Sequence, residues 1–194
     1  MHPIRCKCGT VRGQLDGKGV HNRLICYCTD CRAFANFLGR TAEVLDKQGG
    51  TEIVQVAQPR LRFLQGEERL SAVRLSEKGM VRWYASCCNT PIGNTLADPK
   101  VSFIGLIHVS LDHAQMNSDF GTKIAILNTH TALGQTKPTQ RGLVVVIARF
   151  IWIVVTMRVT GRYKHSQLFN TSGSPRVVPT IIAPQELARF KGAP

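Results

Sequence analysis

Several features of common protein classes are missing from this chain. Residues 1–5 contain no apolar core of the kind that secretory signal peptides carry. The seven cysteines are an odd number, and none lies beyond Cys88. A secreted scaffold held by disulfides is therefore disfavoured, because such scaffolds pair their cysteines in an oxidising compartment. We expect a cytoplasmic chain.

Phosphate loops and dense basic runs are missing as well. Gly9, Gly13 and Gly17 lack the strand and helix context of a phosphate-binding loop. The formal charge is +13, and residues 121–194 hold 10 Lys and Arg against 1 Asp or Glu. These basic residues are spaced singly, without the interleaved aromatic residues of a nucleic-acid platform. We expect a solvated basic surface and no nucleic-acid partner.

No apolar run is long enough to cross a membrane as a helix. The most apolar run, residues 143–157, has 15 residues, whereas a spanning helix needs about 20. Arg149 interrupts this run, and Arg141 and Arg158 flank it. We expect a buried helix or strand here, and the β-branched composition leaves that choice open. A helix in contact with the membrane surface is the alternative, and it is not favoured.

The first 120 residues of the chain contain short runs of β-prone residues. These are residues 51–56, 60–64, 81–84 and 101–107. Gly49, Gly50 and Pro59 suit turns between them. We predict a mainly β domain over residues 1–120. A basic C-terminal extension over residues 121–194 would follow, containing the apolar helix or strand and a short helix at residues 184–190.

The cysteines form three tight groups. They are Cys6 with Cys8, then Cys26, Cys28 and Cys31, and then the adjacent Cys87 and Cys88. Closely spaced thiolates converge on one point from a single bend of the backbone, which is what Zn²⁺ requires. Cysteines one residue apart rarely reach the geometry of a disulfide. The grouping therefore indicates zinc.

The number of groups fits one structural and one catalytic site. A structural zinc takes four protein ligands, whereas a catalytic zinc keeps three and leaves one position open. The middle group is a natural set of three thiolates. Cys6 and Cys8 need partners from far along the chain, and Cys87 and Cys88 are the candidates that remain.

These motifs resemble those of the glutathione-dependent formaldehyde-activating enzyme family, which includes centromere protein V. The matching segments are residues 6–9 (Cys-Lys-Cys-Gly), residues 26–32 (Cys-Tyr-Cys-Thr-Asp-Cys-Arg) and residues 83–93, from Trp-Tyr through Cys-Cys to Thr-Pro-Ile-Gly. The resemblance covers roughly the first 110 residues, and its three-part order is fairly specific.

The resemblance implies a zinc-binding β fold of the Mss4-like type. It implies one structural Zn²⁺ shared by the first and last cysteine groups. It also implies a second Zn²⁺ on Cys26, Cys28 and Cys31 as the reaction centre. The implied activity is that of a carbon–sulfur lyase acting on adducts of a small thiol, glutathione, with an aldehyde.

The chain departs from the family pattern at two of its motifs. The last group is usually Cys-x-x-Cys-Gly, and here Ala85 and Asn89 occupy the first and last of these positions. Cys88 matches the second cysteine, whereas Cys87 is extra and is the weaker candidate ligand. Both can reach one metal only if the backbone turns or bulges, because adjacent strand residues point apart. In the middle group Tyr27 replaces a residue that is often His in the family.

These departures support a rival hypothesis from another class. The chain would then be a zinc-stabilised binding or scaffold module that has lost the reaction. Four arginines near the cysteine groups are candidates for holding the carboxylates of glutathione, although an ordinary surface role is the stronger expectation: Arg5, Arg23, Arg32 and Arg40. His21 precedes the middle group by five residues and is a weak candidate ligand.

Overall fold

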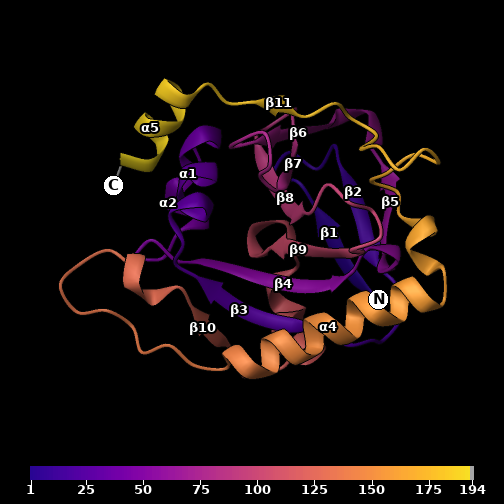
Figure 1. The fold of residues 1–194 in the computed structure, drawn as a ribbon, viewed down its shortest axis with the longest axis horizontal. Helices are drawn as coiled ribbons and strands as arrows, with labels where there is room; N and C mark the ends of the chain where they lie inside the picture. The colour runs from indigo at the N-terminus through magenta and orange to yellow at the C-terminus, as the bar shows by residue number, and fades with distance from the viewer. Residues whose placement is uncertain (193–194) are drawn as a thin grey trace.

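Two β-sheets form the centre of the molecule (Figure 1). The computed structural model describes residues 1–192. A three-stranded sheet has the order β1-β2-β5, and an eight-stranded sheet has the order β10-β3-β4-β9-β8-β7-β6-β11. The strands are β1 (His2–Arg5), β2 (Arg12–Leu15), β3 (Asn22–Cys26), β4 (Thr51–Ala57), β5 (Leu61–Gln65), β6 (Leu70–Arg74), β7 (Val81–Ala85), β8 (Thr90–Thr95), β9 (Phe103–Ile107), β10 (Ala125–Leu127) and β11 (Thr180–Ile181).

The four β-prone runs of the sequence are confirmed as β4, β5, β7 and β9. Along β5 the side chains of Leu61 and Phe63 are buried and that of Arg62 is exposed, as a strand with one buried face requires. All residues of β9 are buried, because the strand lies between β4 and β8 inside the larger sheet. The two sheets, together with the helices around them, make the chain a strand-rich α/β protein.

The main core joins the two sheets around Trp83 on β7. This side chain is fully buried, and its indole N–H donates to Oγ1 of Thr95 at 3.0 Å. The Phe169 ring meets the indole edge-on, with ring centroids 6.4 Å apart. Residues beyond position 120 therefore contribute to the main core.

Within residues 1–192, five α-helices lie around the sheets. They are α1 (Thr29–Leu38), α2 (Thr41–Val44), α3 (Met116–Phe120), α4 (Leu143–Val159) and α5 (Pro184–Gly192). The helix predicted over residues 184–190 is confirmed as α5, which packs against α1 (Figure 1). Phe37 and Phe190 make an edge-to-face contact between them, with centroids 5.7 Å apart. Helix α1 itself was not predicted.

Residues 121–192 extend both edges of the larger sheet. Strand β10 pairs in parallel with β3, and β11 pairs in parallel with β6. Helix α4, orange in Figure 1, runs alongside β3 and β4. The division of the chain at residue 120 stays a prediction.

The apolar run is a helix, but the expectation that it is buried is wrong. Val146, Ile153 and Met157 on the inner side of α4 are buried, whereas Val144 and Trp152 are 79% and 61% exposed. The sheet can cover only one side of a helix, and this helix is apolar on every side. Among the described residues, no helix combines the length and the apolar character needed to cross a membrane.

Candidate metal centres

Two turns bring the first and last cysteine groups together. Cys6 and Cys8 lie in the turn that follows β1, where the Gly9 N–H donates to the Cys6 carbonyl at 3.0 Å. Cys87 and Cys88 lie in the turn between β7 and β8. Asn89 closes that turn with a φ of 53°, a left-handed conformation that Asn tolerates better than most residues.

The four sulfur atoms have the spacing of a tetrahedral metal site. The Sγ–Sγ distances are 3.5 Å for Cys6–Cys8, 3.8 Å for Cys6–Cys87, 3.3 Å for Cys8–Cys87 and 3.8 Å for Cys87–Cys88. Tetrahedral zinc with bonds of about 2.3 Å places its sulfur ligands about 3.8 Å apart. A disulfide bond is about 2.05 Å long, and all seven cysteines are free. The donor set therefore suits zinc.

Cys87 belongs to this cluster together with Cys88. All four sulfur atoms lie within 4.8 Å of one another, so the structure brings the weaker candidate as close as the stronger one. The turn that a shared metal requires is the one closed by Asn89. We call Cys6, Cys8, Cys87 and Cys88 the four-cysteine cluster.

Hydrogen bonds to sulfur act on two members of this cluster. Burial raises the pKa of Cys6, and the Val11 N–H, which donates to its Sγ at 3.2 Å, offsets part of that rise. The Thr10 hydroxyl lies 3.2 Å from Sγ of Cys8 and, with the Thr10 backbone, lowers the pKa of Cys8 to about 6. Desolvation and the Cys8 thiol raise the pKa of Cys87 to about 12. A metal ion would displace the protons that remain, because only thiolates are ligands.

A cavity of about 890 Å³ adjoins the four-cysteine cluster. Cys6 and Cys8 form part of its wall, which carries the basic residues Arg5, Lys7 and Arg12 and the acidic residues Glu43 and Asp112. Cys8 is exposed, so this cluster is in contact with solvent at one side.

The middle group forms a second cluster where β3 leads into α1. Cys26 ends β3, Cys28 is the N-cap of α1, and Cys31 lies in its first turn. The Cys31 N–H donates to Sγ of Cys28 at 3.4 Å. The three sulfur atoms lie within 4.8 Å of one another, and no further His, Cys, Asp or Glu among residues 1–192 joins them. We call this the three-cysteine cluster.

The surroundings of the three-cysteine cluster favour one thiolate at Cys26. Hydrogen bonds from the Cys28 and Cys31 thiols lower the pKa of Cys26 far below its ordinary value. The side-chain amide of Asn128 also donates to Sγ of Cys26, at 3.2 Å. Hydrogen bonds with the Cys26 and Cys28 sulfurs, followed by burial, raise the pKa of Cys31, which keeps its proton until a metal displaces it.

The Tyr27 hydroxyl is hydrogen-bonded outside the three-cysteine cluster. It donates to Oδ2 of Asp46 at 2.8 Å. Desolvation and the Asp46 carboxylate raise the pKa of Tyr27 to about 12, so the phenol stays neutral at ordinary pH. Its role here is to hold the loop that contains Asp46.

The structure places His21 away from both clusters. Its ring lies against Phe120, and its Nε2 is 3.2 Å from the Phe120 carbonyl. Neither cluster contains a histidine among the described residues.

The four candidate arginines have different environments. Arg23 pairs with Glu52 at 2.6 Å, and Arg32 is buried and donates to the Thr131 carbonyl. Arg40 pairs with Glu43 at 2.9 Å and also donates to the Cys88 carbonyl. Three of the four thus hold the fold together, and Arg5 alone is exposed beside the cavity.

Sequence reasoning missed Asn128 and the two threonines that contact sulfur. Asn128 is 102 positions from Cys26, and Thr90 Oγ1 lies 3.1 Å from Sγ of Cys88. For Thr10 and Thr90 the signal is local, since each lies two residues after a cysteine. For Asn128 no local signal exists, because the parallel pairing of β10 with β3 creates the contact.

Two cysteine clusters suited to metal ions, on a strand-rich α/β fold, define the class of this protein. The profile of DUF6151, described as a family of unknown function, matches residues 1–144, and the chain belongs to that family. No curated protein matches. The crystal structure of a structural-genomics target protein from Rhodobacter sphaeroides is similar, with 17% identity and a TM-score of 0.43. The match covers 63% of this chain and 97% of that one.

Proposed function

We propose that this chain is a zinc protein of the formaldehyde-activating type, with an Mss4-like fold and a carbon–sulfur lyase activity. The observation that carries the proposal is the three-cysteine cluster, which offers three thiolates and no fourth His, Cys, Asp or Glu ligand within residues 1–192. Zinc held in this way keeps one position open and supplies a Lewis acid that can hold a thiolate or polarise a carbonyl.

The proposed substrate is the adduct of a small thiol such as glutathione with an aldehyde. In the lyase direction the carbon–sulfur bond breaks, sulfur keeps the electron pair, and the adduct hydroxyl loses its proton as the aldehyde C=O forms. The thiol recovers one proton, so the reaction is balanced without an oxidant or reductant. The addition of thiol to aldehyde is the same sequence in reverse.

The chain's own residues contribute charge control to this chemistry. At the start of α1 the Cys31 N–H donates to Sγ of Cys28, which favours negative charge on that sulfur. Asn128 donates to Cys26 and limits how much charge that thiolate gives to a bound metal. These donors hold the sulfur atoms of Cys26 and Cys28 in place before the substrate arrives.

A second candidate function is a zinc-stabilised module without a reaction. Cys26 and Cys31 are each only 8% exposed, and they pack with Leu24, Ile53 and Val146 in one apolar cluster. Burial of this kind suits a structural metal at least as well as a reactive one. Tyr27, which faces Asp46, likewise offers no general base.

Metal analysis combined with an activity assay separates the two candidates. We expect two zinc ions per chain by elemental analysis, one in Cys28→Ser, and one in Cys8→Ser as the matched control for the other cluster. Exchange between formaldehyde and its glutathione adduct, followed by nuclear magnetic resonance, should be accelerated by the wild type and by Cys8→Ser but not by Cys28→Ser. Two zinc ions per chain without acceleration of the exchange would favour the zinc-stabilised module without a reaction.

A further inference from the structure

The outer face of α4 is an apolar surface that the described part of the chain leaves uncovered. Val144, Ala148, Ile151, Val155 and Val159 follow one another at intervals of four or three residues, so they share one side of the helix. All five are exposed, and none of the buried residues of α4 lies among them. The helix is about 26 Å long, which makes this side a continuous apolar strip.

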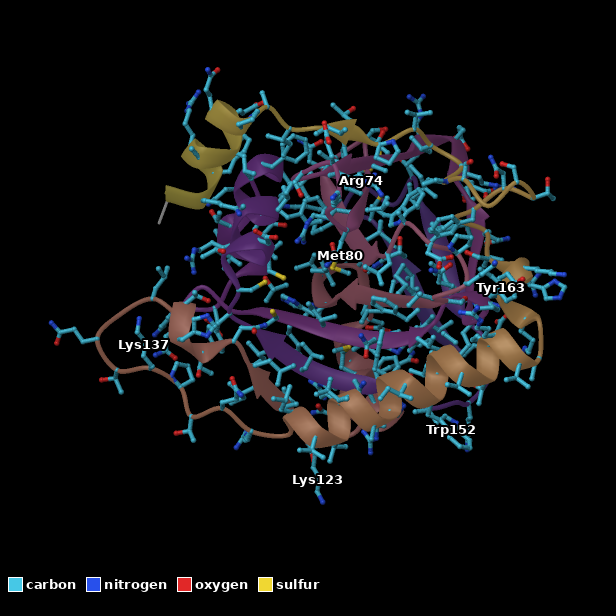
Figure 2. The ribbon with its side chains drawn as sticks, in the orientation of Figure 1. Arg74, Met80, Lys123, Lys137, Trp152 and Tyr163 are labelled. Carbon is cyan, nitrogen blue, oxygen red and sulfur yellow. The ribbon has the colours of Figure 1, made fainter. Side chains whose placement is uncertain are left out.

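Trp152 adds an aromatic side chain next to this strip. It is 61% exposed, and Figure 2 shows it projecting from α4 on the side away from the sheet. Trp is enriched where one end of a side chain is in an apolar layer and the other in water. An apolar helix face of this size with an exposed Trp marks a contact surface rather than a solvated one.

The charged residues of the segment that contains α4 are all basic. Residues 121–185 contain eight Lys or Arg and no Asp or Glu. Arg141 and Arg158 flank the apolar strip at its two ends, and both are exposed. Within residues 1–192, neither these two nor Lys123 and Arg149 form an ion pair.

A basic cavity lies at the N-terminal end of α4. Its volume is about 490 Å³, and Lys123, Arg141 and Arg149 are part of its lining. Figure 2 shows Lys123 projecting outward beside this end of the helix. The N-cap residue is Gly142, which has no side chain to cap the first turn, and that turn contains no acidic residue. Backbone N–H groups and basic side chains thus meet where an anionic group fits.

We infer that α4 docks this protein on an anionic phospholipid surface. The apolar strip enters the boundary between headgroups and acyl chains, as interfacial helices do, while Arg141 and Arg158 extend to the phosphates. A lipid headgroup phosphate occupies the basic cavity. A second copy of the chain is a poorer occupant of the strip, because a two-fold contact through α4 would bring the same arginines toward each other.

Binding to lipid vesicles tests this inference on the full metal-loaded chain. We expect co-sedimentation with vesicles that contain phosphatidylglycerol, weak co-sedimentation with pure phosphatidylcholine, and release as salt increases. Lys123→Gln and Arg141→Gln should each weaken the partition roughly five-fold. Ile151→Gln should weaken it about ten-fold, because a half-exposed side chain loses its burial in lipid.

Two variants on other surfaces serve as controls. Leu64→Gln removes an exposed apolar side chain of β5, and Lys78→Gln removes an exposed charge between β6 and β7. Both should bind vesicles like the wild type. Equal loss in the controls and in the α4 variants, or equal binding to both kinds of vesicle, overturns the inference.

The two tryptophans provide a direct reading of the contact. Trp83 is buried and Trp152 is exposed, so a blue shift of the emission on vesicle addition must come from Trp152. Trp152→Phe should abolish the shift without preventing sedimentation entirely. The absence of a blue shift in the wild type refutes the lipid contact. A concentration-dependent dimer that Ile151→Gln dissociates also refutes it and assigns the strip to a second copy of the chain.

Discussion

Removing the two exposed thiols of the four-cysteine cluster should destabilise the fold far more than their own packing explains. Cys8 and Cys87 are both exposed, and surface substitutions away from special features usually change stability by about 0.5 kcal/mol or less. We therefore expect Cys8→Ser with Cys87→Ser to report on the metal cross-link alone. Cys6 and Cys88 remain, and two thiolates do not complete a zinc site.

The expected magnitude follows from the separation of the two turns. Cys8 and Cys87 are 79 positions apart in the chain. Closing a loop of about 80 residues removes about 4.5 kcal/mol of chain entropy from the unfolded state, by the relation used for disulfides. For a chain of this size that corresponds to a Tm about 10–20 °C lower.

Thermal unfolding of both proteins with and without a chelator measures this effect. The chelator should lower the Tm of the wild type to that of the double variant, because the metal then stabilises neither. The double variant itself should change little on chelation, apart from the smaller contribution of the three-cysteine cluster. A difference in Tm that persists in chelator would show that lost packing, not a lost cross-link, is the cause.

Three further predictions concern the surroundings of the three-cysteine cluster. The pKa of Tyr27 is raised to about 12 in the folded chain, whereas the tyrosine of the unfolded chain ionises near pH 10. The contribution of Tyr27 to stability should therefore be fully present below about pH 10 and be lost as the pH rises toward 12. Tyr27→Phe should flatten this alkaline decline in Tm. Asn128→Gly keeps the left-handed backbone but removes the bond to Cys26, and should lower zinc affinity at one site about 10–100-fold with little change in Tm. Gly50→Ala would place its Cβ 2.6 Å from Asp46 Oδ2, and chemical denaturation should show a loss of about 1–3 kcal/mol.

Local sequence pattern was sufficient to predict the strands whose side chains alternate between buried and exposed or are all buried. In β5 the apolar residues Leu61 and Phe63 alternate with Arg62, so the sequence predicts one buried face. Strand β9 is apolar throughout, so the sequence predicts that both of its faces are buried. Helix α1 was missed although its signals are present. The helix begins at Thr29 and Asp30, and Gly39 ends it with a φ of 64°. The same segment contains the cysteine motif, which was interpreted only as a metal site.

Features that depend on distant pairing could not be predicted. The short strands β10 and β11 extend the sheet by three and two residues, too few for any periodic pattern. The contact of Asn128 with Cys26 depends on that first pairing. The exposure of α4 has the same origin, since its composition is apolar on all sides and only the position of the sheet decides which side is covered.

The two cysteine clusters differ in what their loss would mean for the fold. The four-cysteine cluster joins turns that are about 80 residues apart, so a metal ion held there would stabilise the pairing of the two sheets. The three-cysteine cluster lies within residues 26–31, and β3 and α1 already hold its backbone by their own hydrogen bonds. A site whose position does not depend on its metal can vary in occupancy and ligand without unfolding the protein. That independence suits the proposed chemistry at an open metal position, and it is the physical reason to test the proposed reaction at Cys26, Cys28 and Cys31 first.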